Sequence, residues 1–326
     1  MTVFVARTRR LIERLERRRR ERRASRLARE QDARCKTRLI ADAGASLAEF
    51  LASDARLACP STGADIDLTV VIVIWNQPHF LLRCLRALLT QSGPAMEIVL
   101  VDNGSASETQ QLLSRLDGVS ILRNPANEGF VTACNQGARI ARGRALLMLN
   151  SDAFVRHDAL ANASAALEAD AEIGAVGGRL ILPSGKLQEA GCVVWSDATT
   201  SGYGRGWAPD AGEVMSPRDV DYCSGAFLMT RRALWTELGG FDEAFTPGYY
   251  EEVDYCLRLR QAGYRVLFEP SVAVDHFEHG SEVKREDALR TSERNRRTFQ
   301  ERHASTLRSQ PVRPANANPP PGTNAR

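Results

Sequence analysis

Residues 68–75 read Leu-Thr-Val-Val-Ile-Val-Ile-Trp, and the last six of them form the longest apolar stretch of the chain. β-Branched side chains favour strands, and a run without polar alternation is typical of a strand that is buried on both faces of a parallel sheet. The stretch is far too short to cross a bilayer as a helix. It therefore predicts a central strand of an α/β domain.

Downstream of this run, apolar segments of strand length alternate with segments of helical spacing. The expected strands span residues 96–101, 119–123 and 145–149, and the expected helices span residues 78–91, 107–116, 129–141 and 157–170. Four strand–helix pairs in succession predict a parallel, doubly wound sheet. Ligands of such sheets bind beyond the carboxyl ends of the strands, so functional side chains are expected directly after each strand.

Polar or aromatic residues do follow each of these four strands. In order along the chain they are Trp75 and Asn76, then Asp102, then Asn127 and Gly129, and then Asn150, Ser151 and Asp152. A ring can stack on a base and a carboxylate can accept its hydrogen bonds, so this rim suits a nucleotide, although one polar turn alone is commonplace. The turns contain no glycine-rich phosphate loop. We therefore expect a divalent cation bound by Asp152 to neutralise a pyrophosphate.

These turns and three later blocks resemble the inverting family 2 glycosyltransferases, most of all the bacterial rhamnosyltransferase and O-antigen transferase branch. The later blocks are Gly225-Ala-Phe-Leu-Met229, Gly239-Gly-Phe-Asp242 and Tyr250-Glu-Glu-Val-Asp-Tyr-Cys-Leu-Arg258. The resemblance spans residues 68–281 and implies the glycosyltransferase-A fold, a Rossmann-like doubly wound mixed sheet. It also implies transfer of a hexosyl or deoxyhexosyl group from a nucleoside-diphosphate sugar to a glycan or lipid-linked acceptor, in bacterial surface polysaccharide synthesis.

The same resemblance implies roles for individual residues. Its nucleotide-sugar site comprises Trp75, Asn76, Asp102, Asn127, Gly129, Ser151, Gly225 and Ala226. The triplet Asn150-Ser151-Asp152 occupies the position of the family's Asp-x-Asp metal motif. Asp152 is therefore the one strong carboxylate ligand expected for Mg²⁺ or Mn²⁺, and His276, which follows a later expected strand, is expected to complete the site.

The catalytic base is expected near the start of the block from Tyr250 to Arg258. The resemblance places it at Glu252, where the family has Asp, and Glu251 is the alternative. An inverting transfer needs one carboxylate to take the proton of the acceptor hydroxyl as its oxygen attacks the anomeric carbon. Both glutamates also suit the first turn of a helix, where carboxylates offset the helix dipole, so a structural role is an open alternative at this stage.

The two ends of the chain differ from its middle in composition. Of the 326 residues, the first 40 carry 15 Arg and Lys but only 5 Asp and Glu, although the net charge of the whole chain is +3. We expect a basic helical extension and linker over residues 1–66 and a catalytic domain over residues 67–285. Residues 286–326 are expected to form a charged helix and a Pro-rich disordered tail.

The expected basic helix over residues 7–38 is either a solvated helix or an arm that contacts an anionic membrane. Nucleic acid is disfavoured as a partner because no interleaved aromatic residues or known module accompany the charge. Seven irregularly spaced cysteines indicate reduced thiols, and no apolar run typical of a signal peptide follows the Arg-rich start. These features favour a cytoplasmic protein, with the inner face of the cytoplasmic membrane as a site of peripheral contact.

Two other functions fit parts of the pattern. A nucleotidyltransferase also combines a Rossmann-like half with a metal ion, but it normally has a glycine-rich, basic phosphate loop near the first strand. A nucleotide-sugar- or glycan-binding module without catalysis is the second alternative. The intact Asp152 and the adjacent Glu251 and Glu252 argue against it.

Overall fold

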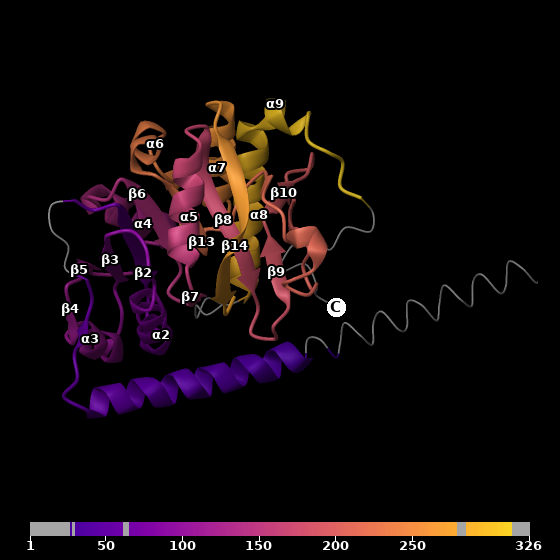
Figure 1. Ribbon diagram of the computed structural model, residues 1–326. Helices are drawn as coiled ribbons and strands as arrows, with labels where there is room; N and C mark the ends of the chain where they lie inside the picture. Colours follow the sequence, from indigo (N-terminus) through magenta and orange to yellow (C-terminus); the bar gives the residue numbers. More distant parts are fainter. Residues whose placement is uncertain (1–26, 28–29, 61–64, 279–284, 315–326) are drawn as a thin grey trace, which may run out of the picture.

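The computed structural model describes residues 27, 30–60, 65–278 and 285–314. One half of its central sheet holds four parallel strands, β2 (Leu68–Ile74), β3 (Met96–Asn103), β5 (Ser120–Asn124) and β6 (Ala145–Leu149). The accompanying helices are α2 (Pro78–Leu89), α3 (Ser107–Leu113), α4 (Phe130–Ile140) and α5 (Ala159–Ala169). The four predicted strand–helix pairs are therefore confirmed (Figure 1).

The other half of the sheet is mixed. Its elements are β7 (Ala153–Val155), β8 (Ile173–Ile181), β9 (Leu187–Ala190), β12 (Arg218–Asp219), β13 (Phe227–Arg231), α6 (Arg232–Glu237), α7 (Glu251–Gln261), β14 (Arg265–His276) and two short 3₁₀ helices (Gly212–Val214 and Glu243–Phe245). β13 runs antiparallel to both β6 and β8, whereas β14 runs parallel to β8. The strand order is β12-β14-β8-β13-β6-β2-β3-β5, with β7 paired to β14 and β9 paired to β8. The antiparallel insertion of β13 gives the mixed sheet that the predicted fold requires.

β2, the apolar strand over Leu68–Ile74, is buried on both faces, as predicted. The even-numbered residues of β2, from Leu68 to Ile74, belong to the apolar cluster that β2 shares with α2 and α5. Val71 points the other way and belongs to the second cluster, which includes residues of α4 and α7. Each fully buried side chain of this size stabilises the fold by about 1.5–3 kcal/mol relative to leaving it exposed.

The segment before the predicted catalytic domain packs against that domain. A helix over residues 30–52 runs beneath α2 and α3, and its Leu47 and Phe50 are buried in the first apolar cluster (Figure 1). The chain then forms β1 (Leu57–Ala58), which pairs in parallel with β4 (Leu116–Asp117). Part of the expected N-terminal extension is thus joined to the sheet domain.

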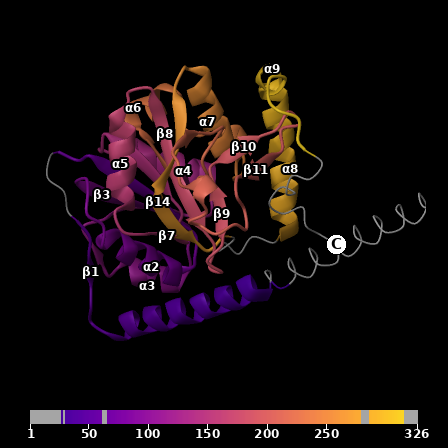
Figure 2. The same ribbon diagram turned by 45° about the vertical axis from the view of Figure 1, so that its right-hand side comes forward.

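The segment after the predicted domain is also packed onto it. α8 (Arg285–Arg302) and α9 (Ala304–Leu307) lie beside the hairpin of β10 (Cys192–Val194) and β11 (Thr200–Gly202), as Figure 2 shows. Phe299 of α8 is completely buried in the second apolar cluster. The predicted disordered tail falls largely on residues 315–326, which lie outside the described residues.

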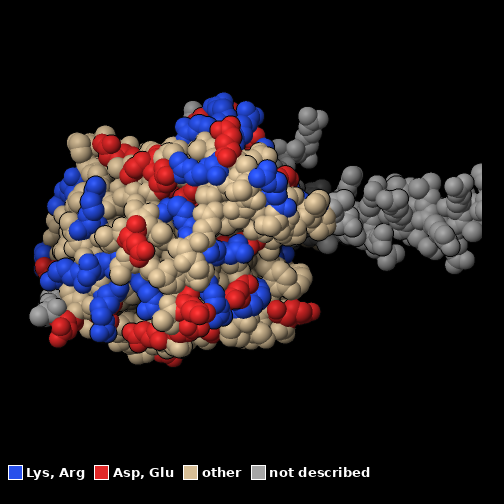
Figure 3. Space-filling model, turned by 90° about the horizontal axis from the view of Figure 1, so that it is seen from above, with Lys and Arg blue, Asp and Glu red and all other residues tan. Residues whose placement is uncertain are grey.

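Positive and negative side chains are interspersed over the face seen from above (Figure 3). Residues 1–26, which carry 11 arginines and most of the predicted basic arm, lie outside the described residues. Within the part of the chain that the structure describes, no helix is both long and apolar enough to cross a membrane.

Candidate active site

Asp152 and His276, the two predicted metal ligands, lie next to each other although 124 residues separate them in the sequence. Their meeting follows from the pairing of β7 with the end of β14, which sets His276 opposite Ala153. The Oδ1 atom of Asp152 lies 3.3 Å from Nε2 of His276, and both side chains are buried. The N–H of Phe277 donates to the carbonyl of Asp152 at 3.0 Å, which fixes the backbone of the pair.

The electrostatics of this pair suit a cation. Burial lowers the pKa of His276, but the charge of Asp152 and its hydrogen bonding outweigh burial, so the pKa lies above its usual value. Oδ1 of Asn150, in the same triplet as Asp152, is a buried atom without a hydrogen-bond partner. Carboxylate and amide oxygens such as those of Asp152 and Asn150 are donors that suit Mg²⁺ or Mn²⁺. No group of three His, Cys, Asp or Glu side chains among the described residues has the geometry of a metal site, so a cation beside Asp152 and His276 would need further ligands.

Glu251 and Glu252 begin α7 and form the predicted catalytic pair. Tyr249 and Tyr250, which precede them, both adopt a left-handed backbone conformation with φ of 74°, so the chain turns sharply into the helix. Oε2 of each glutamate is buried and has no hydrogen-bond partner. Burial, with a further contribution from the charge of Glu189, raises the pKa of Glu252 to about 7.

Glu251 differs from Glu252 in its surroundings. It is 5% exposed, whereas Glu252 is partly exposed. Burial and then the charge of Glu252 raise the pKa of Glu251 well above its usual value. A general base works best with a pKa near the working pH, so the geometry and electrostatics favour Glu252. The position at a helix N-terminus is observed as well, so the structural and catalytic interpretations are compatible.

Gly225 and Ala226 connect the carboxylate pair to the metal triplet. A Cβ atom built on Gly225 would lie 3.7 Å from Cβ of Glu252. The carbonyl of Ala226 accepts a hydrogen bond of 3.1 Å from the N–H of Asn150. The two residues directly before β13 therefore link the proposed base to the residues expected to hold the cation. Ser151, which is partly exposed, belongs to the same turn.

The predicted nucleotide-binding residues at the ends of β2 and β3 are brought together by their turns. The N–H of Asn76 donates to Oγ of Ser105, and Oδ1 of Asn76 accepts from the N–H of Ala106, both at 2.9 Å. Asp102 is buried, and its two oxygens accept from the N–H of Ser105 and from Nε2 of Gln110. Trp75, which follows the last residue of β2, is partly exposed.

Asn103, which the sequence interpretation missed, organises the next turn. Its Nδ2 donates to Oδ1 of Asn127 at 2.8 Å, and its Oδ1 accepts from the N–H of Glu128 at 3.0 Å. Gly129 has a φ of 87°, and a Cβ atom there would come within 2.8 Å of Cα of Pro247. The predicted Asn127 and Gly129 thus belong to a tight turn that packs against the loop before α7.

Asn295 of α8 also escaped the sequence interpretation. Its side chain is completely buried, and Nδ2 lies within 2.7–2.9 Å of the carbonyl oxygens of Phe245, Gly248 and Tyr249. Nε2 of His303 lies 2.8 Å from Asp254 in α7. The C-terminal helices therefore hold the loop and the helix that carry Glu251 and Glu252. α8 is rich in charged residues but also contains other uncharged polar residues, so the sequence offered no signal that singles out Asn295.

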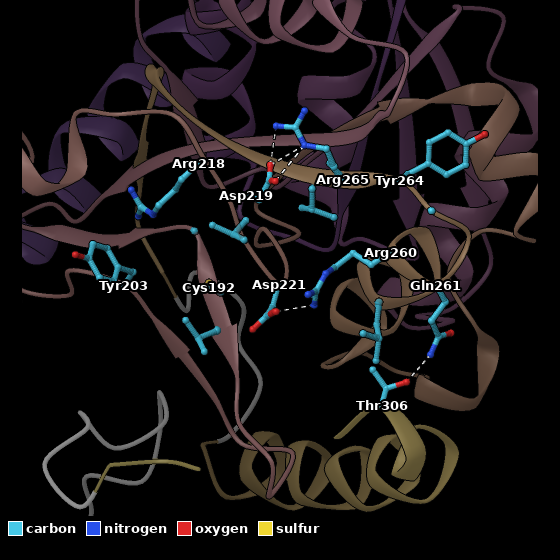
Figure 4. Close-up of a pocket in the computed structure, with 16 residues that line it drawn as sticks. Cys192, Tyr203, Arg218, Asp219, Asp221, Arg260, Gln261, Tyr264, Arg265 and Thr306 are labelled. Carbon is cyan, nitrogen blue, oxygen red and sulfur yellow. Dashed lines mark hydrogen bonds and ion pairs between the residues drawn. The ribbon is translucent and has the colours of Figure 1, made fainter. Parts of the chain in front are cut away.

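A cavity of about 620 Å³ lies elsewhere (Figure 4). α7 contributes Arg260 and β14 contributes Arg265 to its lining, whereas Glu251 and His276 stand at the opposite ends of these two elements. Arg260 is paired with Asp221 at 2.6 Å. None of the predicted site residues lines this cavity, so it is separate from the candidate active site.

Comparison with solved structures shows the fold. The chain resembles the mannosyltransferase PcManGT from Pyrobaculum calidifontis, which was solved with GDP-Man and Mn²⁺, with a TM-score of 0.53 and 19% sequence identity. The match covers 87% of this chain and 78% of that chain. The architecture is the glycosyltransferase-A fold, as the sequence resemblance implied.

Residues 69–236 match the sequence profile of the family described as Glycosyl transferase family 2. Because the match covers more than half of the chain, the protein belongs to this family. Glu251, Glu252 and His276 lie beyond the matched range, so the match does not test the roles expected of them.

Two curated proteins illustrate the relationship. The O-antigen biosynthesis protein RfbC from Myxococcus xanthus is 29% identical over 236 residues, which is 68% of this chain and 18% of that protein. The N-acetylglucosaminyl-diphospho-decaprenol L-rhamnosyltransferase from Mycobacterium tuberculosis is 27% identical over 235 residues, which is 64% of this chain and 75% of that protein. The chain spans less than half the length of several curated relatives that it matches.

Proposed function

We propose that this protein transfers one hexosyl or deoxyhexosyl group, with inversion, from a nucleoside-diphosphate sugar to a glycan or lipid-linked acceptor. The observation that carries the proposal is the position of the Gly225-Ala226 segment. Gly225 adjoins Glu252, and Ala226 is hydrogen-bonded to Asn150 of the metal triplet. A sugar bound over this segment has a base on one side and a cation site on the other.

Glu252 acts as the base in this proposal. It takes the proton of the acceptor hydroxyl while the acceptor oxygen attacks the anomeric carbon, and the bond from that carbon to the diphosphate breaks. A carboxyl pKa of about 7 keeps the group able to accept a proton near neutral pH. Burial and the charge of Glu252 raise the pKa of Glu251 well above its usual value, and Glu251 is the more deeply buried of the two, so it is the less accessible base.

Asp152 and His276 hold Mg²⁺ or Mn²⁺ in the proposed site. A bound divalent cation would neutralise negative charge on the leaving diphosphate. The presence of Mn²⁺ and GDP-Man in the structurally similar mannosyltransferase supports a metal ion and a nucleotide-sugar donor here. Trp75, Asn76 and Asp102 are proposed to bind the base and ribose at the ends of β2 and β3.

The names of the relatives support an acceptor in surface polysaccharide synthesis. One is called an O-antigen biosynthesis protein, and the other is named for a lipid diphosphate acceptor. We place the protein in the cytoplasm, with residues 7–38 contacting the anionic inner face of the cytoplasmic membrane, because the first 40 residues are strongly basic. Binding to vesicles that contain anionic lipid, compared with neutral vesicles, tests this contact.

A donor screen tests the function itself. The full chain is incubated with a panel of nucleoside-diphosphate sugars, with Mn²⁺ or with a chelator, and release of nucleoside diphosphate is measured. One donor is expected to be turned over only with metal. NMR of the glycoside formed with an accepted hydroxyl acceptor then reports the anomeric configuration. Retention of configuration, or nucleotidyl transfer in place of sugar transfer, would contradict the proposal.

A further inference from the structure

We propose that Gln188 is a positioning residue of the metal site, which orients His276 so that its Nε2 lone pair is available to a divalent cation beside Asp152. The inference rests on the proposed function, because it takes Asp152 and His276 as the ligands. Gln188 lies on β9, outside every block that carries the family resemblance.

The geometry around the imidazole ring is specific. Oε1 of Gln188 lies 2.8 Å from Nδ1 of His276, whereas Nε2 on the other side of the ring lies 3.3 Å from Oδ1 of Asp152. The two nitrogens therefore have different environments, with an amide oxygen at one and a carboxylate at the other.

The hydrogen bond at one ring nitrogen decides which nitrogen can bind a metal. An amide oxygen is an acceptor, so Nδ1 must carry the proton that is donated to Gln188. In a neutral imidazole the lone pair is then on Nε2, the atom that faces Asp152. Histidine ligands of metals commonly donate their second N–H to an acceptor in this way, which fixes both the tautomer and the ring orientation.

The burial of Gln188 supports a polar function for this side chain. It is only 5% exposed, and it is held there because β9 pairs antiparallel with β8, the strand next to β14. Placing an amide in such a position is costly unless it is hydrogen-bonded. A leucine would fill similar space without that cost, so packing alone does not account for glutamine here.

Mn²⁺ binding by the purified full chain tests the inference, with free Mn²⁺ followed by electron paramagnetic resonance. Gln188→Leu removes the acceptor, and we expect Mn²⁺ affinity to fall about 10- to 100-fold. Gln188→Glu retains an acceptor and is expected to bind Mn²⁺ at least as tightly as the parent chain. Gln111→Leu, an exposed change on α3, is the matched control and is expected to have no effect.

A second measurement separates orientation from folding. The ¹⁵N shifts of the His276 ring in saturating Mg²⁺, assigned by comparison with His276→Ala, are expected to show a proton on Nδ1 in the parent chain and in Gln188→Glu. Parent-like Mn²⁺ affinity in Gln188→Leu, or a proton on Nε2 in the parent chain, would overturn the inference. If Asp152→Ala binds Mn²⁺ as the parent does, the metal assignment itself is wrong and the Gln188 inference falls with it.

Discussion

Gly225 lies so near Glu252 that a Cβ atom built on it would be 3.7 Å from Cβ of Glu252, within van der Waals contact. The next nearest atom is Cε1 of Phe130, at 3.9 Å. Both are ordinary contact distances, and Gly225 does not have the positive φ that would demand glycine. A side chain longer than that of alanine at position 225 would therefore enter the space beside Glu252, the proposed base.

Substitutions at Gly225 should show whether the protein needs open space beside Glu252 or needs glycine for its backbone conformation. Gly225→Ala is expected to retain transfer and thermal stability, since one methyl group fits. Gly225→Leu is expected to lower the transfer rate at least about tenfold, because its side chain extends into the space beside Glu252. Initial rates and melting temperatures of both variants check this. A fully active Gly225→Leu variant would show that the substrate does not approach β13 here.

Replacing the proposed base should abolish chemistry without abolishing donor binding. Glu252→Gln keeps the shape of the side chain but cannot accept the proton, so transfer is expected to fall by about 100-fold or more. Donor affinity, measured by calorimetry, is expected to stay close to that of the parent chain. Glu251→Gln is the matched comparison. If Glu251→Gln is inactive and Glu252→Gln is active, the base is Glu251.

The raised pKa of Glu252 predicts opposite pH trends for activity and stability. Transfer should increase as the pH rises through about 7, because the deprotonated carboxylate is the base. Stability should change in the other direction, because the folded pKa lies above the ordinary value of 4.5. The contribution is fully present below pH 4.5 and is lost as the pH rises through about 7.

Melting temperatures without metal measure this second trend. Glu252→Gln does not titrate, so its melting temperature should rise relative to the parent chain between about pH 5 and about pH 8. Glu301→Gln, at an exposed position on α8, is the control for a lost surface charge. A constant difference between Glu252→Gln and the parent chain across this range would contradict the raised pKa.

Restoring a carboxylate at the first position of the metal triplet should tighten cation binding. Oδ1 of Asn150 is buried and has no hydrogen-bond partner, so a second negative oxygen there adds a ligand next to Asp152. We expect Asn150→Asp to bind Mn²⁺ more tightly and to gain more thermal stability from Mn²⁺ than the parent chain does. Mn²⁺ titration checks the first expectation, and unfolding with and without the ion checks the second. Weaker binding would place Asn150 outside the coordination shell.

Loss of the Asn295 side chain should affect turnover more than donor binding. Asn295→Ala removes the donor that faces the carbonyls of Phe245, Gly248 and Tyr249, and those buried groups lose a partner. We expect a destabilisation of about 1–3 kcal/mol in urea unfolding. We also expect a lower kcat at nearly constant donor KM, because the loop before Glu251 is less well fixed. Glu301→Ala should change neither quantity, and a KM effect alone would argue against this positioning role.

Local pattern was enough to predict the four parallel strands of the sheet and their ends, whereas the mixed half was implied by the family resemblance. The alternation that starts with Leu68–Ile74 is confirmed, and the polar turns at Asp102, Asn127 and Asp152 lie where the strands end. Asp152 and His276 were paired through the family resemblance, and the contact itself depends on the register of β7 against β14. That register is set by long-range packing, which no local periodicity records.

Buried amides were the part of the site that the sequence did not reveal. Gln188, Asn103 and Asn295 each act through hydrogen bonds to residues at least 21 positions away. A single polar residue in a strand, a turn or a charged helix is statistically ordinary, so nothing in its own neighbourhood marks it. We expected residues 286–326 to lie outside the catalytic domain, and that expectation did not include the hydrogen bonds of Asn295 to the loop before α7.

The hydrogen bonds from Asn295 of α8 to the loop before Glu251 bear on the order in which parts of the protein form during translation. The strands of the sheet all precede α8 in the chain, so a growing polypeptide can assemble the sheet before Asn295 has left the ribosome. The loop that carries the proposed base acquires its buried hydrogen bonds only afterwards. A chain that ends before α8 thus contains every strand of the sheet but lacks the side chains of Asn295 and Phe299, which pack against this loop and the second apolar cluster.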